Sequence, residues 1–280
     1  MKNRTTYLVQ RTTLMLGLII LLGAGCEAEV SEAPKQFPQP ATAVVEPEAV
    51  REQQLPDFME RRIMTYDDGR NVKYILAKIE NSEWRWGLAN EPEAPRTVKD
   101  WQNALTADLV INGSYFDENM NPTGFYQIAY ATSAVVWPQI QDENLGYAGM
   151  VRIYDGKLDL AHLPTDNRGE PAEDETAFLS FPVLIAGHRS QVSEDSKKYA
   201  RRTALAIAGD ETPYIIVTES GSPSLFEMAK WLQEQPEDFR VAVNLDGGTS
   251  TGLYYSDENS GEVVDVTSAV VPNVLYLIHQ

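Results

Sequence analysis

The sequence predicts an α+β fold: a single domain built on a mixed, mainly antiparallel β-sheet with a few packed helices. Three observations support this prediction. Strand-like segments outnumber helical ones, no regular strand–helix repeat is visible, and 280 residues with 43% hydrophobic side chains allow one large core. We expect this domain to span residues 55–280, after a signal peptide at 1–25 and a linker at 26–54.

The N-terminal segment is typical of a bacterial lipoprotein signal. Basic residues precede the apolar run Leu14–Leu22, and small residues then lead to Cys26, the only cysteine of the chain. The run is shorter than the roughly 20 residues that span a bilayer. We therefore expect lipidation at Cys26 and an extracytoplasmic protein anchored to the membrane, in the periplasm or at the cell surface. An ordinary signal peptide that contains a cysteine is the alternative.

Composition narrows the possible partners. Residues 26–54 are rich in proline and glutamate, which favours an extended tether. The chain has 41 acidic and 23 basic residues and a net charge of −18, which argues against nucleic-acid binding because phosphate backbones attract clustered cations. One cysteine excludes disulfides within the chain and a cysteine-based zinc site, and His162, His188 and His279 lack metal-ligand spacing.

The first half of the domain shows strand periodicity interrupted by one helix. Apolar and polar residues alternate in Val72–Ile79, and we expect this strand to pair with Trp84–Leu88 across a short turn. Thr97, with Asp100 three residues later, predicts the start of a helix. Leu109–Ile111 follows as a short buried strand.

Turn and capping residues organise the second half. Asp155-Gly156 predicts a β-hairpin with a type I′ turn. Ser224 and Glu227 resemble a capping box, so we expect a helix over Leu225–Gln233. The acidic stretch His162–Ala177 indicates an exposed insertion. Further strands are expected at Phe181–Ile185, Thr203–Ala208, Tyr214–Thr218, Val241–Leu245, Gly252–Tyr255 and Val274–Ile278.

The first segment with chemical character runs Asn112-Gly113-Ser114-Tyr115-Phe116-Asp117. A buried strand ends there on a polar turn, which would place Asn112, Ser114 and Asp117 at a sheet edge, a common position for groups that bind ligands. A purely structural turn capped by Asn112 is the alternative.

The second segment is Arg201-Arg202-Thr203 at the entry to an expected strand. A guanidinium group at a strand end can bind two oxygens of a phosphate or carboxylate. A surface arginine pair on an acidic protein explains the same residues equally well.

The third segment runs Asn244-Leu245-Asp246-Gly247-Gly248-Thr249-Ser250 after an apolar strand. Asp246 would lie at the end of the strand as a carboxylate. Gly247 and Gly248 permit positive φ and close approach of a ligand, so their N–H groups could form an anion nest. The alternative is a glycine turn of a hairpin that leads into Gly252–Tyr255.

Together and in this order, the three segments resemble the phosphodiester glycosidase family. Ser-Leu-x-Glu-Met-Ala in the expected second helix and Val271-Pro272-Asn273 extend the resemblance from about Tyr74 to the end of the chain. It implies an α+β fold with a mixed sheet and hydrolysis of a sugar–phosphate glycosidic bond, and bacterial members are frequently secreted and associated with exopolysaccharide. The chain departs from the family at Ser114 and Thr249, where relatives often have glycine, and at Glu219-Ser220-Gly221, where Asp-Gly-Arg is usual.

The resemblance implies a role for each site residue. Cleavage of a glycosyl phosphodiester passes through an oxocarbenium-like state and releases a phosphate monoester, so the site needs a cation for the phosphate and a carboxylate as base or nucleophile. We expect Arg202 to be the cation and Asp246 the carboxylate, with Asp117 or Glu219 as a partner carboxylate. The expected substrate-binding residues are Asn112, Gly113, Arg202, Thr203, Asn244, Gly247, Gly248 and Ser250.

We therefore expect a hydrolase that acts on hexosamine-type sugar-1-phosphate diesters of an envelope or external polysaccharide, without a cofactor. Ca²⁺ would suit the oxygen atoms of Asp117 and Asp246, but no EF-hand spacing supports it. Two other classes stay open: a non-catalytic, surface-tethered glycan-binding lipoprotein that stacks sugars on aromatic side chains, and a structural envelope lipoprotein without a small ligand. The aromatic residues in question are Trp137, Tyr254 and Tyr255.

Overall fold

The computed structural model describes residues 54–130, 149–166, 168–257 and 261–280, all within a compact unit that spans Arg51–Gln280. The expected signal peptide, Cys26, Trp137 and all but the last residue of the linker lie outside the described residues. No helix in these ranges is long and apolar enough to cross a membrane.

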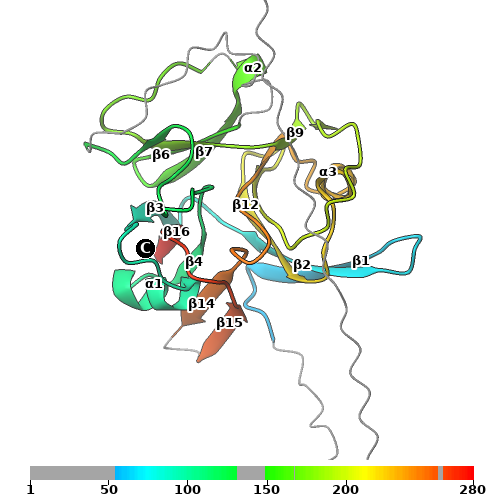
Figure 1. Ribbon diagram of the computed structural model, residues 1–280, viewed down its shortest axis with the longest axis horizontal. Coiled ribbons are helices and arrows are strands. Elements are labelled where there is room, and N and C mark those ends of the chain that lie inside the picture. The colour runs from blue at the N-terminus through cyan, green and yellow to red at the C-terminus, as the bar shows by residue number, and fades with distance from the viewer. Residues whose placement is uncertain (1–53, 131–148, 167, 258–260) are drawn as a thin grey trace, which may run out of the picture. The chain divides into compact units, whose positions relative to one another are not determined.

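The unit is built from three β-sheets (Figure 1). The largest has seven strands in the order β1-β2-β12-β11-β13-β9-β10. Its members are β1 (Met59–Thr65), β2 (Asn71–Lys78), β9 (Val183–Ala186), β10 (Arg189–Ser190), β11 (Thr203–Ile207), β12 (Pro213–Ser220) and β13 (Val241–Asn244).

The second sheet has five strands in the order β15-β14-β4-β16-β3, and the third has four in the order β5-β8-β6-β7. The second contains β3 (Trp84–Asn90), β4 (Leu109–Asn112), β14 (Leu253–Asp257), β15 (Glu262–Val266) and β16 (Asn273–His279). The third contains β5 (Tyr126–Gln127), β6 (Gly149–Tyr154), β7 (Lys157–His162) and β8 (Thr176–Ser180).

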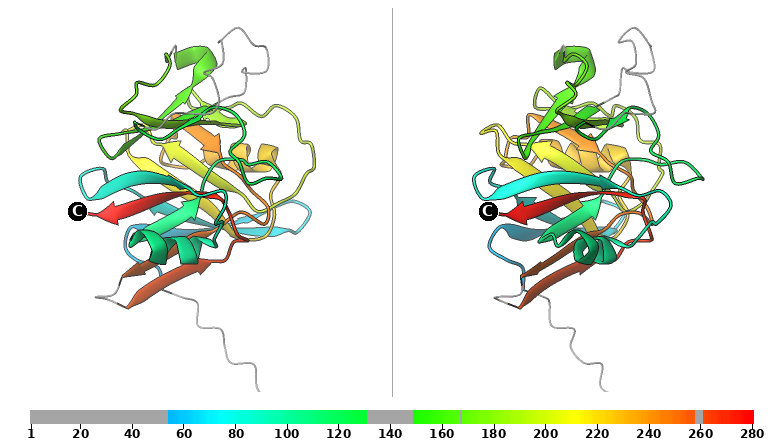
Figure 2. Two further views of the ribbon diagram at one scale, coloured as in Figure 1. Left: turned by 60° about the vertical axis from the view of Figure 1, so that its left-hand side comes forward. Right: turned by 90° about the vertical axis from the view of Figure 1, so that its left-hand side faces the viewer.

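The main hydrophobic core lies between these sheets, because buried side chains from all three form one cluster, among them Ile75, Leu109 and Val151. Two helices cover outer faces (Figure 2). Helix α3 (Leu225–Gln233) packs on the seven-stranded sheet, where the ring of Trp231 stacks on that of Tyr74 at 4.0 Å. Helix α1 (Val98–Leu105) packs on the five-stranded sheet, and the short α2 (Leu163–Asp166) follows β7.

The local predictions from capping and turn residues are confirmed. Thr97 caps α1 and accepts a hydrogen bond from the backbone of Asp100. Ser224 and Glu227 form a reciprocal capping box at the start of α3. Asp155-Gly156 connects β6 to β7, with positive φ at both residues as a type I′ turn requires.

The predicted pairing of strands was wrong in two places. Strand β3 pairs with β16, whereas β2 pairs with β1 and β12, so the expected hairpin between β2 and β3 does not form. The alternative hairpin from β13 into β14 is also wrong, because the two strands belong to different sheets. All these strands bury side chains in the same core, so alternation of apolar residues does not specify which strand is the neighbour.

The fold class is more β-rich than predicted. Every pairing between named strands is antiparallel, and the strands divide among three sheets. The prediction of a single mixed sheet was therefore wrong. The mainly antiparallel arrangement with few helices is confirmed. The insertion at His162–Ala177 is only partly exposed, since His162 is buried at the end of β7 and Thr176 begins β8.

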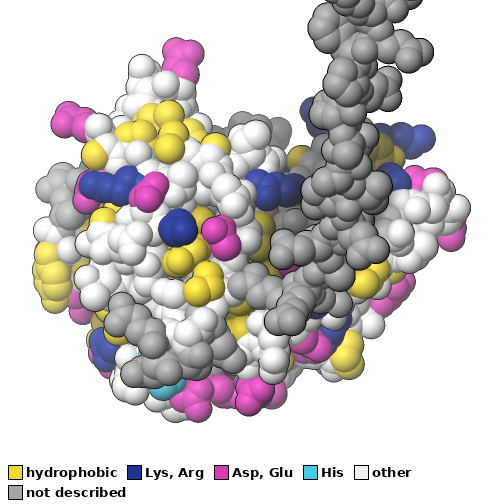
Figure 3. All heavy atoms as spheres, turned by 90° about the horizontal axis from the view of Figure 1, so that it is seen from below, with side chains coloured by type: hydrophobic (Ala, Val, Ile, Leu, Met, Phe, Trp, Pro, Cys, Tyr) yellow, Lys and Arg dark blue, Asp and Glu magenta, His cyan; other side chains and the backbone are white. Residues whose placement is uncertain are grey.

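The surface reflects the acid excess of the chain. On the face in Figure 3, acidic side chains gather along one edge, and Lys and Arg side chains lie scattered, several of them beside an acid. Two arginines illustrate this pairing: Arg61 binds Glu219 at 2.6 Å, and Arg240 binds Glu211 at 3.0 Å.

Candidate active site

The three segments singled out in the sequence meet where β4 and β13 end and β11 begins. The backbone N–H of Asp246 donates to the carbonyl of Gly113 at 3.3 Å, which joins the first segment to the third. The N–H of Gly248 donates to the carbonyl of Arg201 at 2.8 Å, which joins the third to the second. Residues far apart in the chain thus form one edge shared by the two large sheets.

The side chain of Asn112 holds this edge together. Its Oδ1 accepts hydrogen bonds from Thr203 Oγ1 at 2.7 Å and from the N–H of Gly252 at 3.1 Å. Its Nδ2 donates to the carbonyl of Asp246 at 2.8 Å. Asn112 and Thr203 are fully buried and bind each other, so they support the site from within; substrate binding, expected for both from the sequence, stays a prediction.

Gly113 fits here because a side chain would collide with Asn273. A Cβ on Gly113 would lie 2.2 Å from Asn273 Oδ1, which accepts the N–H of Ser114 at 2.7 Å. The N–H of Gly113 donates to the Asn273 carbonyl at 3.1 Å. Asn273 therefore fixes the turn after β4 on which the first segment lies.

Asp246 presents a partly buried carboxylate at this edge. Burial raises its pKa above the ordinary value of 3.8, and hydrogen bonds from the Ser250 hydroxyl and the Gly247 N–H partly offset the rise. The bond from Gly247 to Asp246 Oδ1 measures 2.8 Å. Ser250, predicted to bind substrate, is itself buried and holds this carboxylate.

Arg202 brings a cation to the same loop. Its Nη1 lies 3.7 Å from the position that a Cβ on Gly247 would take. Its Nη2 and Nε donate to the carbonyls of Lys198 at 2.6 Å and Pro223 at 3.3 Å. Burial lowers its pKa, and within the described ranges no carboxylate forms an ion pair with it. This charge is therefore partly desolvated, and no carboxylate among the described residues balances it.

Tyr115 contributes a neutral hydroxyl group near Asp246 and Arg202. Burial raises its pKa to about 12, the negative charge of Asp246 adds to the rise, and Arg202 opposes it. Its hydroxyl therefore stays protonated at neutral pH, and it donates to the Phe181 carbonyl at 2.9 Å. Asn244, buried at the end of β13, donates through Nδ2 to Tyr115 Oη at 2.5 Å and to the Phe181 carbonyl at 3.3 Å.

Phe181 places an apolar face beside these groups. Its ring stacks on that of Tyr115 with centroids 4.7 Å apart, yet 53% of the residue is exposed. The two hydrogen bonds to its carbonyl fix the backbone from which the ring projects, and the stacking on Tyr115 orients the ring. The stacked pair offers a partly exposed aromatic surface in the same region, since Tyr115 is near enough to Asp246 for the carboxylate to raise its pKa.

The anion nest predicted at the two glycines does not form. The N–H of Gly247 is bound to the Asp246 carboxylate, and that of Gly248 to the Arg201 carbonyl. Gly248 does adopt the expected positive φ, at 65°. The glycines shape the loop, and two guanidinium groups lie near it: that of Arg202, and that of Arg201, whose Nη2 donates to the Thr251 carbonyl at 2.9 Å.

The two candidate partner carboxylates have other partners. Asp117 is exposed, and its Oδ1 accepts the N–H groups of Asn119 and Asn121, both at 2.9 Å, within its own turn. Glu219 binds Arg61 with two hydrogen bonds of 2.6 Å. No printed contact in the described residues joins either carboxylate to Asp246, and their catalytic role stays a prediction. No group of three or more possible metal-ligating side chains occurs in the same residues.

Tyr115, Phe181 and Asn273 are the site residues that the assignment of roles from sequence missed. Tyr115 and Asn273 do lie inside the motifs that carried the family resemblance, so a signal was present. Phe181 gave none, because an aromatic residue at the start of a strand is usually part of a core.

Comparison with known proteins identifies the family and relates the fold to solved structures. The family model described as phosphodiester glycosidase matches residues 106–278. The catalytic domain of zebrafish N-acetylglucosamine-1-phosphodiester α-N-acetylglucosaminidase, auto-inhibited by its pro-peptide, has a similar fold: TM-score 0.55 and 16% identity over 79% of this chain and 82% of that one. A hypothetical protein from Synechocystis gives a TM-score of 0.53 and 14% identity over 79% of this chain and 62% of that one. No curated protein matched by sequence.

Asn112→Asp tests the role of the buried amide. The substitution replaces the donor to the Asp246 carbonyl by an acceptor and buries a charge, so we expect the free energy of unfolding to fall by about 3 kcal/mol at neutral pH. Acidification should restore part of the loss, because a protonated carboxyl can donate. Urea denaturation measures both effects. Asn103→Asp, on the exposed side of α1, is the matched control and should change stability by less than about 0.5 kcal/mol. Equal losses for both variants would contradict the proposed role of Asn112.

Asp246→Asn should stabilise the protein at neutral pH. A carboxyl whose pKa is raised by folding binds its proton more tightly in the folded state, so its contribution to stability is largest below the unfolded pKa and is lost as pH rises through the folded pKa. Asparagine carries no charge, so the variant does not lose this stability as the pH rises. Thermal melting should show a higher Tm than the native chain at pH 7 and no difference at a pH below 3.8. A lower Tm at pH 7 in a variant of native secondary structure would refute the claim that burial penalises this carboxylate.

Proposed function

Because this chain belongs to the phosphodiester glycosidase family, we propose that it hydrolyses the glycosidic bond of hexosamine-type sugar-1-phosphate diesters. The observation that carries the proposal is Arg202, a partly buried cation beside the Asp246 loop that the described carboxylates leave unpaired. A phosphodiester would supply the missing negative charge. The zebrafish relative is named for N-acetylglucosamine-1-phosphodiester, which supports the choice of a hexosamine.

Arg202 and Asp246 divide the chemistry between them. As the bond between the anomeric carbon and the phosphate oxygen breaks, its electron pair passes to the phosphate, and the guanidinium stabilises the charge that develops there. A phosphate monoester is a fair leaving group, so acid assistance matters less than in ordinary glycosidases. Asp246 takes the proton of the attacking water or attacks the anomeric carbon itself, and the first-formed anomer of the product distinguishes these routes.

The remaining groups orient the substrate. The protonated hydroxyl of Tyr115 and the amide of Asn244 bind the Phe181 carbonyl, which fixes the backbone that carries the exposed Phe181 ring. An aromatic face of this kind suits the C–H face of a sugar ring, while polar groups around it match the hydroxyls. Asp117 and Glu219 are proposed as further carboxylates for the reaction.

The sequence before the described residues supports an extracytoplasmic location for this activity. A lipid attached to Cys26 and a proline-rich linker would hold the domain outside the cytoplasm, at the membrane. Polysaccharides of the envelope or of the exterior are the phosphodiester-containing substrates that such a domain would meet. We include this location in the proposal.

The test of the proposal is hydrolysis by the full chain and by Asp246→Asn. Native protein and variant are incubated with a panel of hexosamine-1-phosphodiesters, and free reducing sugar is measured. We expect the native chain to release sugar and the variant to lose about a thousandfold or more in kcat, as enzymes do when a reacting group is removed. The acid limb of kcat/KM should lie above pH 3.8, because burial raises the pKa of Asp246.

Asp67→Asn, in the exposed turn between β1 and β2, is the matched control and should keep native activity. Sugar release that survives in a folded Asp246→Asn would contradict the role of this carboxylate. No release by the native chain, together with saturable glycan binding that the variant retains, would identify the glycan-binding lipoprotein instead.

Arg202→Gln separates phosphate recognition from sugar recognition. Loss of a charge-assisted hydrogen bond of about 1.5–3 kcal/mol should raise KM for the diester roughly 10- to 100-fold, while the affinity for the free hexosamine product stays unchanged. Kinetics and calorimetric titration measure the two effects. Arg85→Gln, at an exposed site, is the control. Equal weakening for diester and free sugar would show that Arg202 supports the fold and not the phosphate.

A further inference from the structure

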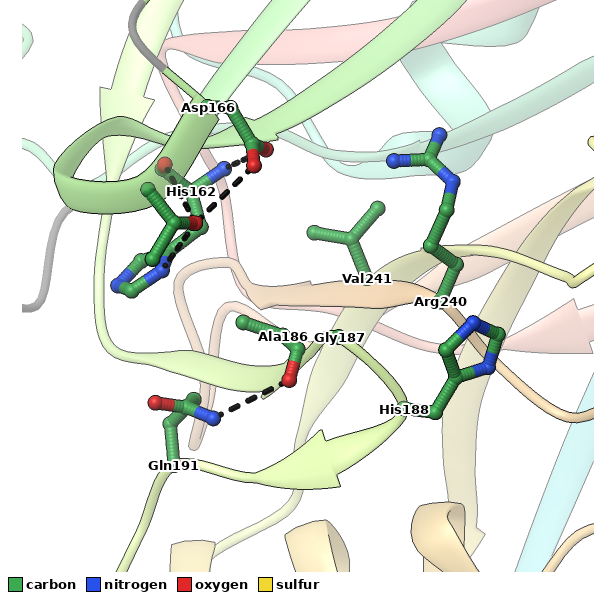
Figure 4. A pocket seen from close by; sticks show the side chains of 9 residues that line it. His162, Asp166, Ala186, Gly187, His188, Gln191, Arg240 and Val241 are labelled. Carbon is green, nitrogen blue, oxygen red and sulfur yellow. Dashed lines mark hydrogen bonds between the residues drawn. The ribbon is translucent and has the colours of Figure 1, made fainter.

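A second hollow lies at the other ends of the strands that carry the candidate active site (Figure 4). It is an open cavity of about 430 Å³, formed by the end of β7 with α2, by the segment around the β9–β10 turn and by the start of β13. Val241 at this cavity and Asp246 at the active site are five residues apart, roughly 16 Å along an extended chain. The cavity is therefore separate from the site described above.

Hydrogen bonds around the cavity set the proton position on His162, a residue only 7% exposed. The carboxylate of Asp166 accepts two hydrogen bonds, one from the backbone N–H of His162 at 2.8 Å and one from the hydroxyl of Thr165 at 3.0 Å. Thr165 Oγ1 lies 3.0 Å from His162 Nδ1 and 3.4 Å from the His162 carbonyl, and when its one proton goes to Asp166 it accepts from His162 Nδ1–H. His162 Nε2 then carries a lone pair, and no described residue donates to it.

The other polar groups at the rim are mostly acceptors as well. Gln191 Nε2 donates to the carbonyls of Ala186 at 3.3 Å and Arg189 at 3.0 Å, which leaves its Oε1 to accept. His188 Nδ1 lies 2.9 Å from Asp238 Oδ1, so a proton shared there leaves Nε2 as an acceptor. Arg240 binds Glu211 through Nε and Nη2, which balances its charge and leaves Nη1 as a donor.

We propose that this cavity is a second carbohydrate-binding site, which takes a neutral sugar unit. Sugar hydroxyls both donate and accept hydrogen bonds, so they can pair with the acceptors His162 Nε2 and Gln191 Oε1 and with the donor Arg240 Nη1 along this cavity. A phosphate brings few donors and would face Asp166. The apolar lining of Ala186 and Val241 matches the C–H face of a sugar, and the volume lies in the range of small-molecule sites. Such a site would hold a glycan apart from the bond that is cleaved.

The three histidines of the chain provide the test. Two, His162 and His188, line the cavity, whereas His279 lies on β16, where its ring packs edge-on against Trp84 at 4.9 Å. The full chain, labelled in its histidine rings and carrying no histidine tag, is titrated with N-acetylglucosamine and its dimer and followed by NMR. We expect saturable shifts of the His162 and His188 ring signals and none of His279. Inorganic phosphate should leave all three unchanged.

Gln191→Leu removes one acceptor and should weaken the binding that these signals report about tenfold, with hydrolysis unchanged. Gln280→Leu, at the exposed C-terminal residue, is the control. Saturating sugar that shifts no cavity histidine, or shifts His279 equally, would overturn the proposal. Shifts with phosphate but not with sugar would replace it by an anion site. Because the readout is binding at this cavity, its failure leaves the proposed hydrolysis untouched, and loss of hydrolysis leaves this result standing.

Discussion

The arrangement of the site depends on one buried amide, that of Asn112. Its three hydrogen bonds join the end of β4 to β11, to the Asp246 loop and to the start of β14, and so connect the two large sheets at the edge where the functional groups lie. A buried amide must satisfy its donor and acceptor together, so the partners are held to a narrow geometry. Asn273 and Gly113 extend the same constraint to the adjoining turn.

The electrostatics of the site differ from those of the surface around it. Elsewhere the acidic chain neutralises arginines with carboxylates, as Arg61 with Glu219 and Arg240 with Glu211. At the site, Arg202 is held by backbone carbonyls, and the Asp246 carboxylate is partly removed from water. Both charges cost folding free energy that a ligand or a reaction could recover, which is the usual sign of a functional site.

Strands β9 and β13 run from the candidate active site to the second cavity. One end carries Phe181, Asn244 and Asp246, where the proposed diester would react, and the other carries the cavity with His162 and Arg240, where Glu211 balances the charge of Arg240. The chemistry of the two ends is complementary: one suits an anion with a sugar attached, the other a neutral sugar. A polymer of repeated sugar phosphates would contain both.

The sequence by itself determined what depends on neighbouring residues and on motif content. The caps of α1 and α3, the hairpin at Asp155-Gly156 and the family resemblance all follow from short segments, because a cap or tight turn is decided by side chains a few residues apart. Only the tertiary structure decided that β3 pairs with β16, that Asn112 and Thr203 are buried supports, and that Phe181 stacks on Tyr115. Each of these features is a contact between residues far apart in the chain. Alternating apolar residues indicate which face of a strand is buried, but they do not specify which segment covers that face.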